Sequence, residues 1–178
     1  MTGYSDGLKS LYPLKIMMKL SDINWQAWQP TEVATLLFVI RDEQILLIRK
    51  KRGLGAGKIN GPGGRIEPGE TPLECAIRET QEELCITPHN VEFCGDLFFQ
   101  FIDGFSIRGH VYKADNFDGE PTETDEAIPH WFRLDEIPYE EMWEDDHTWI
   151  PHMLNGTVFS GRYLFDGDRM LEQDLELN

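Results

Sequence analysis

The sequence predicts one domain of the α/β (α+β) class, built on a mixed β-sheet. The chain has 178 residues, of which 40% are hydrophobic, and this is enough for one sizeable core but too little for two ordinary domains. Runs of β-forming residues surround two helical segments without the regular strand–helix alternation of a parallel sheet. These two observations favour helices packed on a mixed sheet.

The first 30 residues show no clear hydrophobic periodicity and are interpreted as an N-terminal extension of a domain formed by residues 31–178. Trp25 and Trp28 are expected to anchor part of this extension on the domain. Beyond it, three pairs of apolar runs flank short polar turns, as the strands of a hairpin do. The pairs are 33–40 with 44–49, 91–102 with 105–112, and 163–165 with 170–175.

A helix is expected over residues 72–84. Thr71 and Glu74 have the spacing of a capping box, and Pro72 occupies the first helical position. A second helix is expected near residues 146–154. On the first helix the face toward the sheet is predicted to hold five residues: Leu73, Ala76, Ile77, Thr80 and Leu84.

The cysteines and the N-terminal residues indicate the cellular compartment in which the protein is expected. The three cysteines are odd in number and form no C-x-x-C pair, so neither a disulfide framework nor a zinc ribbon is expected. The apolar stretch at 11–20 is broken by Pro13 and is shorter than a membrane span, and no small-residue cleavage site follows it. We therefore expect a cytoplasmic protein that makes no use of a membrane.

The charge balance limits the partners. With 16 basic and 32 acidic residues, the formal net charge is −16. Such a polyanion repels a nucleic-acid backbone at long range, so a long nucleic acid is not an expected partner. A small anionic substrate remains compatible if a cation bridges it to the protein.

Three carboxylates, Glu79, Glu82 and Glu83, share one face of the first predicted helix. They repel one another in its C-terminal half, where the helix dipole also disfavours them. A hard divalent cation with oxygen ligands would neutralise them, which points to Mg²⁺ or Mn²⁺. The alternative is a solvated acidic face in an acidic protein.

The glycine-rich loop at 53–69 fits neither of two common phosphate-binding motifs. Lys58 follows Gly57, but no glycine lies five positions before Gly57 and Ile59 stands where a P-loop needs Ser or Thr. Lys58 also occupies the third glycine position of a dinucleotide fingerprint. The loop is therefore interpreted together with the helix that follows.

From Gly64 the chain reads G-x(5)-E-x(7)-R-E-T-Q-E-E-L-C-I, ending at Ile86. This resembles the signature of the Nudix hydrolase superfamily, G-x(5)-E-x(7)-R-E-U-x-E-E-x-G-U, in which U is a bulky aliphatic residue. Thr80 stands at an aliphatic position. Cys85 replaces the glycine that normally ends the helix, so a less tight turn is expected there.

The resemblance implies a Nudix-type α/β/α sandwich and an enzyme that hydrolyses nucleoside diphosphates linked to another moiety. It implies that the metal is held by the carbonyl of Gly63 and the side chains of Glu79, Glu82 and Glu83, with Glu126 as an additional metal or general-base position. It implies that Arg78 orients Glu82 and that Glu70 supports the helix. The catalytic candidates are thus Arg78, Glu82, Glu83 and Glu126, and the choice of base stays open.

From Val33 onward the chain is also similar to the oxidised-purine nucleoside triphosphatases within this superfamily. That similarity implies hydrolysis of substrates such as 8-oxo-dGTP and 2-hydroxy-dATP to the monophosphate and pyrophosphate. It implies further that the substrate-binding residues are Thr35, Lys50, Asn60, Gly63, Gly64, Trp143, Asp145 and Asp146, with Trp143 stacking on the base. Trp131 is assigned to the core.

Asp145 and Asp146 have a physical interpretation of their own. Two carboxyl groups that converge on an apolar pocket cannot both ionise cheaply, so the pair is expected to share one proton. Moving that proton exchanges donor and acceptor, which would admit either oxidised purine. The alternative is that Asp146 caps the following helix while Asp145 is solvated.

Three functions are compatible with these residues: an oxidised-purine triphosphatase, a Nudix hydrolase for ADP-ribose or an RNA 5′ end, and a non-catalytic nucleotide-binding module. A panel of oxidised and normal nucleotides would distinguish them. The net charge disfavours a long RNA, and the acidic pair with Trp143 disfavours ADP-ribose. The intact carboxylates disfavour a non-catalytic module. A monomer is expected.

Overall fold

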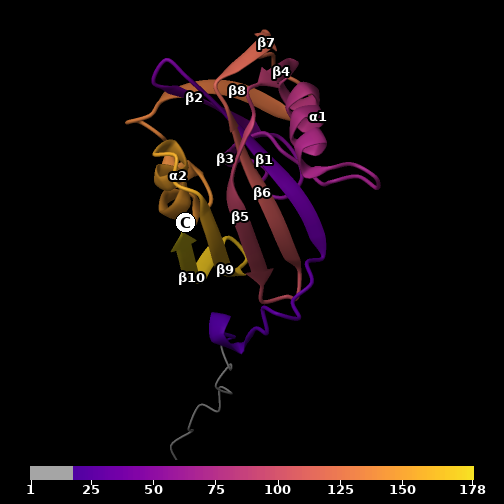
Figure 1. Ribbon diagram of the computed structural model, residues 1–178, viewed down its shortest axis with the longest axis vertical. Coiled ribbons are helices and arrows are strands. Elements are labelled where there is room, and N and C mark those ends of the chain that lie inside the picture. Colours follow the sequence, from indigo (N-terminus) through magenta and orange to yellow (C-terminus); the bar gives the residue numbers. More distant parts are fainter. Residues whose placement is uncertain (1–17) are drawn as a thin grey trace, which may run out of the picture.

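A computed structural model describes residues 18–178, so the first 17 residues of the predicted extension lie outside the described part. Two α-helices flank a large sheet (Figure 1). The elements are η1 (Leu20–Asp22), β1 (Glu32–Arg41), β2 (Gln44–Lys50), β3 (Ile59–Asn60), α1 (Pro72–Leu84), β4 (Ile86–His89), β5 (Glu92–Phe101), β6 (Ser106–Ala114), β7 (Asn116–Gly119), β8 (Ala127–Arg133), η2 (Tyr139–Glu141), α2 (Asp146–Leu154), β9 (Phe159–Asp166) and β10 (Arg169–Leu177).

The sheet is mixed, as predicted. Its strand order is β10-β9-β5-β6-β1-β2-β3, and β8 also pairs with β2. The β1–β6 and β5–β9 pairs are parallel, whereas the three predicted hairpins β1–β2, β5–β6 and β9–β10 are antiparallel. A separate ribbon joins β4 to β7. The sequence did not predict β3, β4, β7 or β8, which are short strands or carry a proline that weakens the strand pattern.

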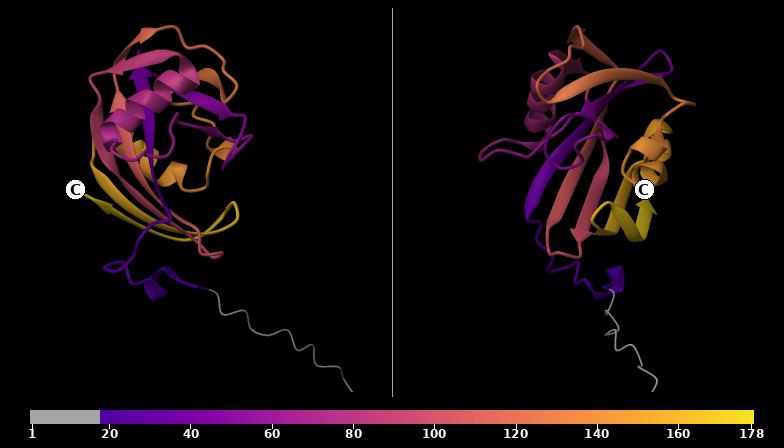
Figure 2. Two further views of the ribbon diagram at one scale, coloured as in Figure 1. Left: turned by 90° about the vertical axis from the view of Figure 1, so that its right-hand side faces the viewer. Right: turned by 180° about the vertical axis from the view of Figure 1, so that it is seen from behind.

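Each face of the sheet has its own core, because successive residues of a strand point to opposite faces. In β1, Leu37 and Val39 pack with Ala76 and Leu84 of α1, whereas Phe38 packs on the other face with Trp149 of α2. Figure 2 shows the two helices on opposite sides of the sheet. The α/β/α sandwich is therefore confirmed, and Trp131 packs against the α1-side core as assigned.

The helix α1 starts and ends where the sequence predicts, and Thr71 and Glu74 form the predicted capping box. The predicted buried face is partly wrong, however. Leu73 is 42% exposed, while Cys75 and Glu83 are buried beside Ala76, Thr80 and Leu84. The buried stripe is rotated because the glycine-rich loop covers the flank of α1 that carries Cys75 and Glu83.

The turn after α1 also differs from the expectation. Cys85 adopts the left-handed conformation that a glycine adopts at this position, with φ 61° and ψ 27°, and its N–H donates to the carbonyl of Gln81. The turn is as tight as with glycine, but a side chain in this region costs roughly 1 kcal/mol.

Cys85→Gly should therefore raise the free energy of unfolding by about 0.5 kcal/mol, since the strain is lost and backbone entropy offsets part of that gain. Urea unfolding at constant m-value measures it. Cys85→Ala retains the strain and should give no comparable gain. Equal stability of the two variants would contradict the explanation.

The described end of the extension packs on the sheet as predicted for its tryptophans. The rings of Trp25 and Trp28 have centroids 5.5 Å apart, and both contact Phe98 of β5 edge-on. The segment thus covers part of the α1-side face that α1 leaves open. Among residues 18–178, no helix is long and apolar enough to cross a membrane.

Candidate active site

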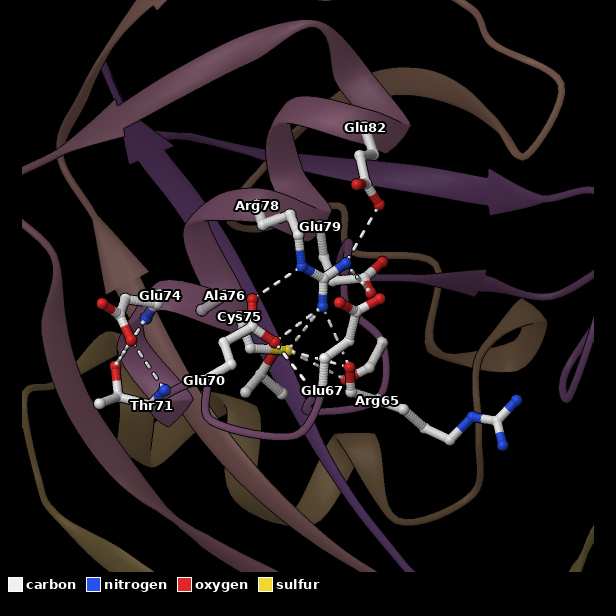
Figure 3. A network of polar contacts seen from close by, with 12 residues as sticks. Arg65, Glu67, Glu70, Thr71, Glu74, Cys75, Ala76, Arg78, Glu79 and Glu82 are labelled. Carbon is white, nitrogen blue, oxygen red and sulfur yellow. Dashed lines mark hydrogen bonds and ion pairs between the residues drawn. The ribbon is translucent and has the colours of Figure 1, made fainter.

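Arg78, on α1, is the centre of a network of carboxylates (Figure 3). Its Nε and Nη2 donate to both carboxylate oxygens of Glu70, at 2.7 and 2.9 Å. Its Nη1 donates to Glu79 at 2.7 Å and to Glu82 at 3.1 Å. Hydrogen bonds from Arg78 lower the pKa of Glu70 to about 2. Arg78 therefore contacts Glu82, the acid that the resemblance assigns to it, and it also contacts Glu79 and Glu70.

Glu83 lies apart from this network and is buried. One of its carboxylate oxygens accepts the N–H of Gly63 at 3.0 Å, and the residue is only 2% exposed. Burial raises the pKa of Glu83 from 4.5 to about 7, although the bond to Gly63 and the nearby charge of Lys50 oppose the rise. Glu83 is thus a buried acid whose ionised form needs positive charge nearby.

The glycines of the loop allow this close approach. A Cβ at Gly63 would overlap the carbonyl oxygen of Thr35, and one at Gly64 would overlap the carboxylate of Glu79. The carbonyls of Pro62 and Gly64 accept backbone hydrogen bonds from β1. Within the described residues no backbone N–H donates to the carbonyl of Gly63. That oxygen remains available as a ligand.

Glu126 directly precedes β8. Its carboxylate is paired with the guanidinium of Arg52. Its negative charge also contributes to the raised pKa of Glu79 and of Glu83, so the three acids interact electrostatically.

The predicted ligands are all oxygen atoms, which is the donor set that Mg²⁺ and Mn²⁺ prefer. The buried Glu83 also favours a cation, because an unpaired charge is costly there. Across residues 18–178, no three His, Cys, Asp or Glu side chains already converge as a metal site. The acids are instead held by arginines and by the glycine loop, and Glu82 extends toward solvent with 56% of its side chain exposed.

A cavity of about 560 Å³ opens beside Gly63 and Gly64 on the α2 side of the sheet. All eight predicted substrate-binding residues line it, namely Thr35, Lys50, Asn60, Gly63, Gly64, Trp143, Asp145 and Asp146. Four phenylalanines that were not predicted from the sequence form an aromatic part of the remaining wall, namely Phe99, Phe101, Phe105 and Phe165. The alternating aromatic positions of β5 were a usable signal for this wall.

Asp145 and Asp146 are both 2% exposed at the end of this cavity. Asp145 accepts the indole N–H of Trp149 at 2.9 Å, and Asp146 accepts the backbone N–H of Trp143 at 3.1 Å. Burial raises the pKa of Asp145 from 3.8 to about 6, and burial together with the charge of Asp145 raises the pKa of Asp146 well above 3.8.

The alternative interpretation of this pair is therefore wrong. Asp146 is the first residue of α2, its carboxylate accepts an N–H that precedes the helix, and Asp145 is not solvated. The sequence analysis did not single out Trp149, which orients Asp145 from one turn further along α2.

This burial has a consequence for stability. Because folding raises the pKa of Asp145 from 3.8 to about 6, the folded state binds the proton of this carboxyl more tightly than the unfolded state does. The resulting contribution to the free energy of unfolding is fully present below about pH 4 and is lost as the pH rises through about 6. Without divalent metal, Asp145→Asn should flatten the decline in the free energy of unfolding between pH 4 and 6 by about 2 kcal/mol.

Urea titrations at each pH measure this decline. Asp135→Asn is the control, because Asp135 is exposed and Arg133 lowers its pKa, which puts its own effect below pH 4. Parallel curves for Asp145→Asn and the unsubstituted chain would refute the assignment.

Trp143 forms one side of the cavity. Its ring meets Phe165 edge-on at 5.8 Å, and the ammonium of Lys58 lies 4.9 Å from its centroid. Lys58 also pairs with Asp168 of the β9–β10 turn at 3.2 Å. A Cβ at Gly55 would approach the indole nitrogen to 2.9 Å. The glycine loop and the β9–β10 turn therefore fix the position of this ring.

Three further residues predicted to bind the substrate are Asn60, Lys50 and Thr35. Asn60 ends β3, and its side-chain oxygen accepts the N–H of Gly61 at 2.8 Å, which leaves its amide NH₂ for a ligand. Lys50 ends β2 and is close enough for its charge to lower the pKa of Glu83. Thr35 is buried, and its hydroxyl lies 3.3 Å from the thiol of Cys75.

A mixed sandwich whose glycine loop leads into a carboxylate-bearing helix defines a class of phosphoanhydride hydrolases. The chain belongs to that class, the Nudix family: the profile of the NUDIX domain matches residues 30–153. Nudix hydrolases generally use a divalent metal.

Within the family, the chain is 41% identical over 148 residues to the oxidized purine nucleoside triphosphate hydrolase of Danio rerio, which covers 82% of this chain and 95% of that protein. It is 38% identical to the Mus musculus protein of the same name, over 79% of this chain and 92% of that protein. The crystal structure of a mutator MutT protein from Bacillus halodurans superposes with a TM-score of 0.74 at 28% identity, covering 82% of this chain and 97% of that one.

Proposed function

We propose that this Nudix enzyme is a Mg²⁺-dependent pyrophosphohydrolase of oxidised purine ribo- and deoxyribonucleoside triphosphates, such as 8-oxo-dGTP and 2-hydroxy-dATP. Its products are the nucleoside monophosphate and pyrophosphate. One observation carries the proposal: a single cavity extends from the buried acids Asp145 and Asp146 to Gly63 and Gly64 beside α1. The names of the zebrafish and mouse relatives agree with it.

Base recognition is assigned to the part of the cavity that Asn60, Trp143 and the buried acid pair line. The ring of Trp143 offers a stacking surface, and Asn60 offers an amide for the purine edge. Asp145 and Asp146, sharing one proton, present one donor and one acceptor. Exchange of that proton lets one pocket accept purines whose edges differ in donor and acceptor order.

Phosphate chemistry is assigned to the other end. The groups that would hold Mg²⁺ are the carbonyl of Gly63 and the carboxylates of Glu79, Glu82, Glu83 and Glu126. When bound, Mg²⁺ would neutralise the triphosphate and lower the pKa of a water molecule. Lys50 faces the same region and adds positive charge for the phosphates. Arg78 and Glu70 fix the orientation of Glu79 and Glu82. Glu82, Glu83 and Glu126 are the candidates for the group that accepts a proton from the attacking water.

A panel of oxidised and normal NTPs and dNTPs, scored for pyrophosphate release with Mg²⁺ and with Mn²⁺, tests the proposal. We expect kcat/KM for 8-oxo-dGTP and 2-hydroxy-dATP to exceed that for dGTP and dATP by at least about tenfold, as expected for buried hydrogen bonds that a normal base leaves unmade. Equal rates on normal nucleotides would reject base selectivity.

Two other candidates would give different results in the same panel. Hydrolysis of ADP-ribose or of a capped RNA 5′ end in preference to the triphosphates would favour another Nudix activity, although the net charge of −16 opposes a long RNA. Nucleotide binding without turnover in either metal would indicate a non-catalytic module.

We further propose that the enzyme acts as a monomer in a reducing compartment, the cytoplasm. The cysteines are unpaired, with Cys75 and Cys94 buried and Cys85 exposed. Sedimentation at micromolar concentration under reducing conditions would test the monomer, and a mass of two chains would refute it.

A further inference from the structure

The end of the N-terminal segment is bonded to the hairpin that joins β5 and β6. The indole N–H of Trp28 donates to the side-chain oxygen of Gln100 at 2.8 Å. Three residues later, the N–H of Thr31 donates to the hydroxyl of Ser106, and the N–H of Ser106 donates back to the hydroxyl of Thr31. Figure 2 shows this segment, in indigo, passing beneath the ends of β5 and β6.

Gln100 transmits this contact to the hairpin backbone. The residue is 9% exposed, and its amide NH₂ donates to the carbonyls of Phe101 at 3.0 Å and of Phe105 at 3.2 Å. Its oxygen is the acceptor for Trp28, so all three contacts depend on one orientation of the amide. Without the indole N–H, the amide keeps its two NH₂ contacts but loses the bond to its oxygen, so it is less firmly fixed.

The hairpin bonded in this way carries part of the cavity wall. Since side chains alternate along β5, Gln100 faces the N-terminal segment while Phe101 faces the cavity on the other side of the sheet. Aromatic contacts continue from there: Phe105 lies 5.7 Å from Phe101, Phe101 lies 5.6 Å from Phe165, and Phe165 lies 5.8 Å from Trp143. The last ring is the one assigned to stack on the base.

We propose that Trp28 is a positioning residue for the substrate base. Through Gln100 it fixes the hairpin that carries Phe101 and Phe105, and through their contact with Phe165 it fixes the aromatic wall that meets Trp143. The segment before the strands of the domain is therefore part of what determines substrate affinity. This inference rests on the proposed function, because it assigns the base to this wall.

Trp28→Phe tests it in the full chain, because phenylalanine retains an aromatic ring but lacks the N–H donor. Trp25→Phe is the matched control: among residues 18–178 its indole N–H donates only to the carbonyl of Leu20, within the segment, and its ring belongs to the same aromatic cluster. We expect Trp28→Phe to raise KM for 8-oxo-dGTP about threefold to tenfold with kcat within about twofold, and Trp25→Phe to change neither parameter beyond about twofold.

A double-mutant cycle separates this path from general loosening. Gln100→Met removes the acceptor, so Trp28→Phe should raise KM no further in that background. Additive increases in KM, or equal increases in Trp28→Phe and Trp25→Phe, would overturn the inference.

Hydrogen exchange supplies a readout that needs no substrate. The amides of Phe101 and Gly104, which are bonded within the hairpin, should exchange faster in Trp28→Phe than in Trp25→Phe. Unchanged exchange together with unchanged KM overturns the role of Trp28. If the unsubstituted chain does not hydrolyse 8-oxo-dGTP, the proposed function fails instead, and the exchange data still decide whether Trp28 fixes the hairpin.

Discussion

Glu83→Gln should lower kcat for 8-oxo-dGTP in Mg²⁺ by about 10³-fold, within the range for loss of a positioned acid–base group or metal ligand. Glutamine keeps an oxygen that can accept the N–H of Gly63, so the contact at 3.0 Å survives and only the ionisable group is lost. Because the amide carries no buried charge, we expect the free energy of unfolding at pH 8 not to fall. Pyrophosphate release and urea unfolding measure the two effects.

Glu74→Gln is the matched control for this change. Glu74 is an exposed acid on the same helix, and glutamine can replace it in the capping box with Thr71. It removes the same charge from α1 and should leave kcat within about twofold of the unsubstituted value. Full turnover by Glu83→Gln in Mg²⁺ would show that the chemistry is assigned to the wrong carboxylates.

Asp145→Asn and Asp146→Asn should shift the selectivity between 8-oxo-dGTP and 2-hydroxy-dATP in opposite directions. Each asparagine acts as a permanent donor at its own position, as if the shared proton were fixed there. Both keep an oxygen for their present partners, Trp149 and the N–H of Trp143. A buried mismatch of donors costs about 1–3 kcal/mol, so the kcat/KM for the disfavoured purine should fall about 10- to 100-fold.

The measurement is the ratio of the two kcat/KM values in each variant. Asp135→Asn, an exposed substitution beside Arg133, should leave this ratio unchanged. A shift in the same direction for both variants of the buried pair would refute the shared proton and indicate a loss of charge alone.

Much of the fold could be predicted because its signals are local. The bounds of α1 follow from Thr71, Pro72 and the periodic stripe, and the three hairpins follow from short polar turns between apolar runs. Which face of α1 is buried could not be predicted, because the burial of Glu83 and the exposure of Leu73 depend on the glycine loop that packs beside the helix. Turn residue preference likewise gave no sign that Cys85 would adopt a glycine conformation.

The eight substrate-binding residues that the family resemblance implies all line the cavity, and their roles stay predictions. The resemblance did not identify residues that reach the site through tertiary contacts. The indole of Trp149 reaches Asp145 only once α2 is packed, and Arg52 meets Glu126 only where β2 and β8 pair. The phenylalanine wall comes from β5, from the turn after it and from β9, and β5 and β9 are distant in sequence and parallel in the sheet.

The close packing of Gly63 and Gly64 also restricts how this enzyme can be re-engineered. Because a methyl group at either position would overlap Thr35 or Glu79, no side-chain diversity can be introduced where the loop meets the phosphate region. Leu54 lies on the same cavity and is 51% exposed, so it can be varied without disturbing a core. A library intended to change the accepted base should therefore begin at the rim, and the loop glycines should be left untouched.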